Sequence, residues 1–188
     1  MAYGRVNAGA LVVAILWMTG ALLSLSSAGR ACGTELWSLK VLSDAMAPTH
    51  FNPIWTTLGS LSSLPAPHPH NSRTTLERNT YQLRATLMSY RQEPDQDYHL
   101  VLADATQRSM IAEIPSPNCA PSPSLANIWR GLREQLDSRF GGGSATWTKA
   151  NATVVLAGVL FFDVPHGQSG MAPNAVELHP VLQLKIER

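Results

Sequence analysis

Apolar and polar side chains alternate along consecutive segments in the middle of the chain. The alternation is clearest over residues 81–87, and the segments 98–103 and 109–114 follow after polar turns, the first of which is 91–97. A period of two places successive side chains on opposite faces, which is typical of a half-buried β-strand. The pattern predicts a meander of three strands with short connections.

One segment has the periodicity of a helix. Its apolar residues recur three or four positions apart and form a single stripe: Leu125, Ile128, Trp129, Leu132, Leu136 and Phe140. Ser124 is a suitable N-cap residue, and the glycines at 141–143 end the helix, as glycine does beyond a C-terminus. We expect this helix to pack on the sheet, and we infer no function from its apolar stripe.

Further strand-like runs follow the helix at 153–163 and 176–184. The predicted order is three strands, one helix and two strands, which is the order of the OB-fold, a five-stranded Greek-key barrel. We therefore predict a mainly β fold with one helix. It consists of an OB-like barrel over residues 74–188, preceded by an irregular N-terminal arm over residues 29–73.

The arm is rich in proline, which prevents any long helix. Within it, residues 32–41 are expected to form a short strand or a turn, and residues 56–64 a single helical turn. We expect Trp37 and Trp55 to pack on the main domain. A disordered tail is the alternative.

The first 28 residues have the pattern of an export signal. Arg5 precedes an apolar run over residues 8–23, and Ser26-Ser27-Ala28 is a small-x-small cleavage pattern. The run is short for a membrane span, which needs about 20 residues. The pattern predicts a signal peptide at 1–28 and an extracytoplasmic location (secreted, periplasmic or cell-surface). An uncleaved anchor is the alternative, and it is the only membrane contact that we expect.

Export affects how the two cysteines are interpreted. In an oxidising compartment a pair of cysteines usually forms a disulfide, so Cys32 and Cys119 are predicted to be bonded. Two free thiols are the alternative for a cytosolic protein. Zinc is not expected on these cysteines, because neither belongs to a CxxC pair.

The charge balance argues against nucleic acid as a partner. The formal net charge is +1, and Arg5 is the only charged residue among residues 1–28, so 13 basic and 13 acidic residues follow. A neutral chain has no electrostatic signature for nucleic acid or for an anionic membrane. We therefore expect the partner to be a small molecule, a glycan or a protein.

The OB-fold pattern also predicts where a ligand would bind. The usual binding face is bordered by the loop between strands one and two and the loop between strands four and five. Here these loops are 91–97 and 163–175, which are among the most polar segments of the domain. The ligand-binding candidates lie in these loops and at the adjoining strand ends: Asp95, Asp97, His99, Asp163, His166, Gln168, Asn174, Glu177 and His179.

A subset of these side chains has the chemistry of a metal site. Asp97 and His99 share one face of a strand, as do Glu177 and His179, and both of the latter are expected to point away from the barrel interior. With His166 they would offer a divalent cation mixed oxygen and nitrogen ligands. A structural network of hydrogen bonds is nevertheless the favoured interpretation of these residues. A ligand-contacting polar cluster is the next alternative, ahead of a metal or acid–base site.

No motif in the chain assigns a reaction. There is no GxSxG nucleophile elbow, P-loop, dinucleotide fingerprint or HExxH helix, so catalytic residues stay unknown and a role other than catalysis is favoured. The leading hypothesis is an exported OB-like binding module. A metal-dependent phosphodiesterase, with Arg84 and Arg91 as its nearby arginines, is one alternative. A structural or protein-interaction domain of the cell envelope is another.

Several phrases of the sequence occur together: DYHLVLAD, MIAEIPSPNC, GVLFFD, HGQSGMAPN and ELHPVL. With CGTELWSLK at 32–40 they resemble a bacterial family of uncharacterised exported proteins that has no established activity. The resemblance covers roughly residues 77–184 and implies the fold and export, but no chemistry. Leu36 stands where the pattern has arginine, so the resemblance implies no role for the arm.

Overall fold

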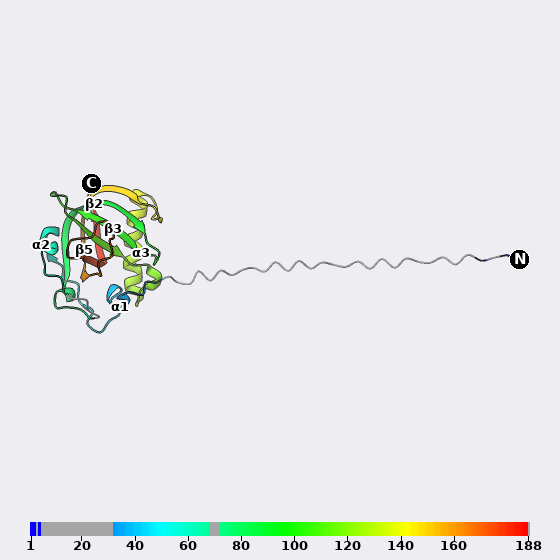
Figure 1. Ribbon diagram of the computed structural model, residues 1–188, viewed down its shortest axis with the longest axis horizontal. Helices are drawn as coiled ribbons and strands as arrows, with labels where there is room; N and C mark the ends of the chain where they lie inside the picture. The colour runs from blue at the N-terminus through cyan, green and yellow to red at the C-terminus, as the bar shows by residue number, and fades with distance from the viewer. Residues whose placement is uncertain (3, 5–31, 68–71, 188) are drawn as a thin grey trace.

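The described part of the chain is mainly β. The computed structural model describes residues 1, 2, 4, 32–67 and 72–187, so the apolar run and the cleavage pattern of the predicted signal peptide lie outside the described residues. A six-stranded sheet, in the order β1-β2-β3-β4-β6-β5, curves around the core, and one long helix runs along its side (Figure 1).

The strands are β1 (Ile54–Trp55), β2 (Thr80–Gln92), β3 (Tyr98–Ala103), β4 (Ser109–Ile114), β5 (Thr148–Phe162) and β6 (Val176–Ile186). The helices are α1 (Trp37–Lys40), α2 (Leu58–Ser62) and α3 (Pro123–Phe140), with 3-10 turns at Leu76–Arg78 and Pro117–Cys119.

The strand pairings form a closed circuit. β2 pairs with β3 and β3 with β4, both antiparallel, and β4 pairs with β6 in parallel. β6 then pairs antiparallel with β5, and β5 returns to pair antiparallel with β2. β1 adds a short parallel edge beside β2. The mainly β prediction is therefore confirmed. The prediction of five strands and one helix is incomplete, because the sheet gains a sixth strand, β1, and the helices α1 and α2 accompany the predicted long helix.

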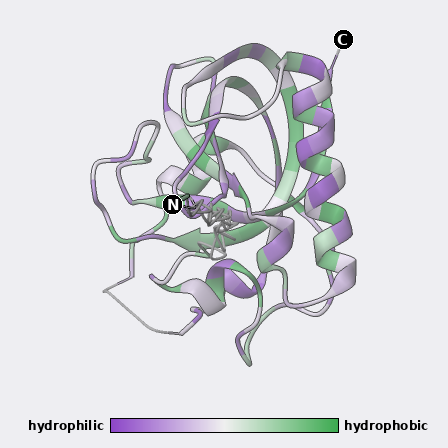
Figure 2. Ribbon diagram, turned by 90° about the vertical axis from the view of Figure 1, so that its right-hand side faces the viewer, coloured by the Kyte–Doolittle hydropathy of each residue, from purple (hydrophilic) through white to green (hydrophobic). Residues whose placement is uncertain are grey.

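The core fills the inside of this circuit with the apolar positions of the alternating pattern. Leu83 and Leu87 of β2 and Leu100 and Leu102 of β3 are fully buried in it. The long helix α3 contributes part of its predicted stripe, namely Trp129, Leu132 and Leu136. Hydrophobic and hydrophilic positions alternate along α3, as expected for a helix with one face on the core (Figure 2).

The bounds of some elements differ from the predictions. β2 continues through Gln92, because Gln92 still pairs with Tyr98, so the connecting turn is shorter than predicted and spans 93–97. The helix begins two residues early, because Ser122 rather than Ser124 is its N-cap and accepts the Leu125 N–H at 3.3 Å. The start of β5 is also earlier than predicted, since residues 148 and 149 already pair with β2.

The arm contains two short helices and the two-residue strand β1. α1 lies within the predicted 32–41 segment, and α2 is the predicted helical turn, capped by Thr57, whose side chain accepts the Ser60 N–H at 3.0 Å. Trp37 packs against the core as predicted. The same prediction is wrong for Trp55, whose exposed fraction is 64%, because β1 lies at the sheet edge with both of its side chains facing solvent.

A disulfide between Cys32 and Cys119 confirms the predicted pairing. The two Cα atoms are 5.9 Å apart, and the bond joins the start of the arm to the turn that follows β4. Such a bond is typical of a non-reducing compartment. None of the helices among residues 32–67 and 72–187 has both the length and the apolar character that a membrane span requires.

Removing the disulfide should destabilise the fold. The bond closes a loop between residues 87 positions apart, and on the chain-entropy model a loop of this size stabilises by up to about 4 to 5 kcal/mol. We expect the Cys32→Ser/Cys119→Ser variant to unfold at a clearly lower urea concentration than the oxidised protein. The wild type reduced with dithiothreitol should match the variant. Equal midpoints for the variant and the oxidised protein would contradict this account.

Candidate functional site

Charged and titratable side chains are buried together on the outer face of the sheet, beneath the arm. Each has at most 8% of its surface exposed: Lys40, Asp97, His99, Glu113, Asp163, Glu177 and His179. We call this set the buried polar cluster. Buried ionisable groups are costly unless they compensate one another, so their concentration in one place is a feature to be explained.

The strand pattern explains why these side chains lie on the outer face. On β6, Leu178 and Val181 belong to the core, while Glu177 and His179 do not. On β4, Ala112 and Ile114 belong to the core, and Glu113 lies between them on the opposite face. The prediction that the β6 pair points away from the interior therefore agrees with the structure, but the pair is covered by the arm rather than exposed.

Glu113 lies between two imidazole rings. Its Oε1 is 3.0 Å from Nδ1 of His99, and its Oε2 is 3.2 Å from Nδ1 of His179. Nε2 of His99 is 2.8 Å from the carbonyl oxygen of Ser169, in the loop after β5. A carbonyl oxygen only accepts, so His99 donates from Nε2. It also donates from Nδ1 whenever Glu113 is ionised, which makes His99 a cation.

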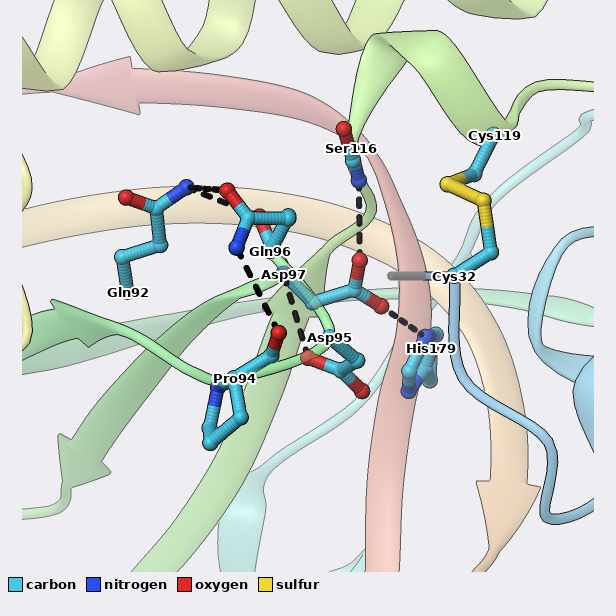
Figure 3. Close-up of a disulfide and its surroundings, with 9 residues drawn as sticks. All are labelled: Cys32, Gln92, Pro94, Asp95, Gln96, Asp97, Ser116, Cys119 and His179. Atoms are coloured by element: carbon cyan, nitrogen blue, oxygen red, sulfur yellow. Dashed lines mark hydrogen bonds and ion pairs between the residues drawn. A yellow bond between two sulfur atoms is a disulfide. The ribbon is translucent and has the colours of Figure 1, made fainter. Parts of the chain in front are cut away.

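Asp97 and Glu177 complete the surroundings of His179. Oδ2 of Asp97 is 3.6 Å from Nε2 of His179, while its Oδ1 accepts the backbone N–H of Ser116 at 2.9 Å (Figure 3). Oε2 of Glu177 is 3.8 Å from Nδ1 of the same ring. These distances allow Coulombic attraction, yet neither ring nitrogen of His179 makes a hydrogen bond within the described part of the chain.

The arm contributes one cation to the cluster. Nζ of Lys40 donates to Oδ2 of Asp163 at 3.3 Å and lies 5.5 Å from the centre of the Phe161 ring. The ring of Phe161 is in turn 5.8 Å from that of His179. Burial alone would lower the pKa of Lys40, but the carboxylates of Asp163, Glu113 and Glu177 together outweigh it, so the pKa is raised and Lys40 stays charged.

The cluster shifts the pKa values of its members in opposite directions. Burial raises the pKa of Glu177 above its usual range, and the nearby carboxylates of Glu113 and Asp163 raise it further. For Glu113 the effect of burial is outweighed by His179 and His99, which lower its pKa. Burial would lower the pKa of His179, but Glu113 and Asp97 raise it to about 9. Perturbed values of this kind are concentrated at functional sites.

A cleft of about 310 Å³ opens beside the cluster. Its walls come from the arm, the two predicted loops and β4: Gly33, Thr34, Glu35, Lys40, Glu93, Pro94, Asp95, Glu113, His166 and Gln168. Residues 94 and 168, which belong to different loops, therefore face the same space, as the sequence predicted. Glu113 and Lys40 belong to both the cleft and the cluster, so the cluster forms the inner end of the cleft.

Glycines let the walls of the cleft approach one another closely. A Cβ atom on Gly33 would lie 3.0 Å from the ring of Trp37 and 3.3 Å from Oδ2 of Asp95, so the arm rests directly on the 93–97 turn. Gly170 has a φ of +87°, and a Cβ there would lie 2.8 Å from a methyl group of Val101. The loop after β5 is thus held against β3.

The structure places most of the predicted site residues around the cleft. Asp97, His99, Asp163, Glu177 and His179 belong to the buried polar cluster, and Asp95, His166 and Gln168 line the cleft. Asn174 has another role, because its side chain donates to the carbonyl oxygens of Leu61 and Leu64 at 3.0 Å and ties the loop to α2.

Sequence reasoning did not include Glu113 and Lys40 among the site residues. Glu113 carried a signal, since it is an acidic residue inside an otherwise apolar strand. Lys40 carried none, because its pairing with Asp163 joins residues 123 positions apart. His166, which the sequence grouped with the metal ligands, is exposed at the cleft rim, and its Nδ1 bonds to the carbonyl oxygen of Val164 at 2.6 Å.

Comparison with known proteins does not place the chain in a family. No protein-family model matches the chain, and no curated protein matches it. The resemblance to exported bacterial proteins therefore stays a prediction, and the functional argument depends on the geometry of the cleft and the buried polar cluster.

Removing the arm's cation should destabilise the protein. Lys40→Met leaves the buried carboxylate of Asp163 without its cation, and breaking a buried pair in this way costs about 3 to 5 kcal/mol. Lys40→Met/Asp163→Asn, which removes both charges, should recover much of that loss, and Lys149→Met on the exposed part of β5 serves as the control. Urea unfolding would measure all three. A single variant as stable as the control would refute a buried ion pair here.

The free energy of unfolding of the EDTA-treated protein should fall as the pH rises from about 6.5 to 9. The folded pKa of His179 is raised, so its contribution is complete below 6.5 and is lost as the pH passes about 9. The pKa of Glu177 is also raised, so its ionisation opposes folding as the pH rises above 4.5. The pKa of Glu113 is lowered, so its contribution is lost below 4.5.

Thermal melting between pH 4 and pH 9 measures this dependence, and the maximum is expected between about pH 4.5 and 6.5. His179→Gln should flatten the decline above pH 6.5, whereas His166→Gln, at the exposed rim, should not. A wild type that is equally stable at pH 6.5 and pH 9 would show that the cluster does not titrate in this way.

Proposed function

We propose that the chain is an exported OB-like binding module that takes a small, positively charged ligand in the cleft between the loops 91–97 and 163–175. The closed circuit of strands supports the barrel assignment. Its parallel β4–β6 pairing and the position of α3 between β4 and β5 are those of a five-stranded OB barrel with β2 as its first strand.

Export is supported by two independent features. The disulfide between Cys32 and Cys119 suits an oxidising compartment, and residues 1–28 have the pattern of a signal peptide. The proposed location is therefore extracytoplasmic: secreted, periplasmic or on the cell surface.

The position of the buried polar cluster is the observation that carries the binding function. In OB-folds the second and third strands form the usual binding face, bordered by the two loops. Here His99 of β3 and Glu113 of β4 lie on the corresponding strands, and both loops line the cleft beside them. A fold that needed only stability would be served as well by apolar side chains at these buried positions.

The charge of the cleft indicates the class of ligand. Its walls carry four carboxylates, those of Glu35, Glu93, Asp95 and Glu113, against one lysine, Lys40. Lys40 is paired with Asp163, Glu93 with Arg91, and Glu113 with two histidines. The walls are therefore acidic mainly through Glu35 and Asp95. Acidic walls attract cations and repel phosphates. A volume of about 310 Å³ is at the small end of ligand pockets, which fits a metabolite-sized amine or amino sugar.

The alternative of a metal-dependent phosphodiesterase has weaker support. Such an enzyme needs positive side chains near the transferred phosphoryl group. Arg84 pairs instead with Glu187, and Arg91 pairs with Glu93 at 2.8 Å and stacks on the ring of Trp147. Neither arginine lines the cleft. A purely structural role in the envelope is the second alternative, and it predicts no ligand.

Thermal melting of the EDTA-treated protein tests the proposed function. Spermidine and glucosamine should raise the melting temperature, because a ligand that binds only the folded state stabilises it, whereas glucose and glutarate should not. Asp95→Asn and Glu35→Gln in the cleft should weaken the response. Glu134→Gln on the exposed surface of α3 should leave it unchanged. No response to either cation, or an equal response in the cleft variants and the control, would refute the proposal.

A further inference from the structure

We propose that Asp97, Glu113 and His179 form a binding site for one divalent transition-metal ion, such as Zn²⁺ or Mn²⁺, at the inner end of the cleft. This inference deepens the proposed binding function, because the ion would lie where the cleft meets the buried polar cluster. It differs from the set expected from the sequence, because it includes Glu113 and leaves out His99, His166 and Glu177.

The three side chains converge from different strands. Asp97 immediately precedes β3, Glu113 is in β4 and His179 is in β6, and one ligand atom from each lies within 4.8 Å of the others. Asp97 and His179 face each other in Figure 3. Metal–ligand bonds of about 2.0 to 2.1 Å in a tetrahedral site place neighbouring ligand atoms about 3.3 Å apart. Nδ1 of His179 lies 3.2 Å from Oε2 of Glu113, close to this spacing. Oδ2 of Asp97 approaches the other ring nitrogen, Nε2, at 3.6 Å. The ion would bind one of the two nitrogens, with the ligand atoms within 4.8 Å of one another before it binds.

Unsatisfied polar atoms point to a ligand in this position. Oδ2 of Asp97 and both ring nitrogens of His179 are buried and make no hydrogen bond within the described part of the chain. Asp97 and His179 are both 0% exposed. Such atoms are rare in folded proteins, because each loses its hydration without replacement. A metal ion bonded to the free oxygen and to one ring nitrogen removes part of this deficit.

The other carboxylate oxygens are already held in place. Oδ1 of Asp97 accepts the Ser116 N–H at 2.9 Å, and Oε1 of Glu113 bonds to His99 at 3.0 Å. His99 is fixed from its other side by the carbonyl oxygen of Ser169. Metal ligands are commonly oriented by hydrogen bonds of this kind. His99 is therefore a positioning residue for Glu113 rather than a ligand.

The charge of the cluster matches a divalent ion. A histidine that binds a metal is neutral. With His179 neutral, the carboxylates of Asp97, Glu113, Asp163 and Glu177 oppose the cations Lys40 and His99, and two negative charges are left. An ion with two positive charges would make the buried set neutral.

The donor set favours transition metals over calcium. One imidazole nitrogen with two carboxylate oxygens suits Zn²⁺ or Mn²⁺, whereas Ca²⁺ takes six to eight oxygen ligands. Three protein ligands leave a coordination position open. Because Glu113 also lines the cleft, that position would face the space in which a ligand binds.

Isothermal titration calorimetry of the untagged, EDTA-stripped protein with ZnCl₂, MnCl₂ and CaCl₂ tests this site. We expect one Zn²⁺ or Mn²⁺ per chain and weaker binding of Ca²⁺. Glu113→Gln and His179→Gln should weaken binding at least 100-fold, and His99→Gln by about 10- to 100-fold, as for other residues that orient metal ligands. His50→Gln, which alters an exposed histidine outside the cleft, is the matched control and should bind like the wild type.

Co²⁺ binding to the wild-type protein keeps the test decisive if a variant of a proposed metal-binding residue fails to fold. Co²⁺ should bind with the same stoichiometry, show visible absorption typical of mixed nitrogen and oxygen ligands, and be displaced by Zn²⁺. No transition-metal binding, or binding lost in His50→Gln but kept in His179→Gln, would overturn the proposal. Spermidine or glucosamine binding to the stripped protein would sustain the cleft function even then, so the two failures are distinguishable.

Discussion

The fold depends on compensating several buried charges on the outer face of its sheet. Glu113 is central to this compensation, because it lies between the rings of His99 and His179 and links β3, β4 and β6 electrostatically. The arm then supplies Lys40 to Asp163, so the charges at the end of β5 are balanced by a segment far away in the sequence. Without the arm, these carboxylates and imidazoles would be open to water on one side.

Most of β4 and the first part of β6 are therefore buried on both faces, but by different means. The inner face packs apolar side chains against each other and against α3, as in any mainly β core. Beside the outer face of β4 and β6 lies the arm, which contributes Lys40 to the buried polar cluster. The arm is attached by apolar side chains that enter the core (Val41, Leu58 and Leu61), by the Lys40 ion pair and by the covalent bond at Cys32. The cleft lies between the arm, the two loops and β4.

The local sequence pattern was sufficient to predict the strands and the long helix, but not where the arm packs on them. The alternation in β3 and β4 and the apolar stripe of α3 depend on neighbouring residues, so the bounds of both strands were predicted correctly. Cys32 and Cys119 were paired by elimination. The exposure of Trp55 and the burial of Lys40 depend on which surface the arm lies against, and no local pattern contains that information.

The same distinction applies to the site. Turn residues located both loops, and the OB-fold order predicted that they share a rim. The sequence could not show that Asn174 holds α2 or that His166 turns back to its own loop, because each depends on partners that only the folded chain brings within reach. Glu113 was the residue whose context, an acid within an apolar strand, most clearly indicated a special role.

The bond between Cys32 and Cys119 has a consequence for when the cleft can form. One wall of the cleft is the segment just after Cys32, and the bond ties this segment to the turn after β4. Before the two thiols are oxidised, this wall has no covalent tie to that turn. Completion of the cleft is thereby coupled to the redox environment, and at the proposed extracytoplasmic location the wall would be fixed only after export.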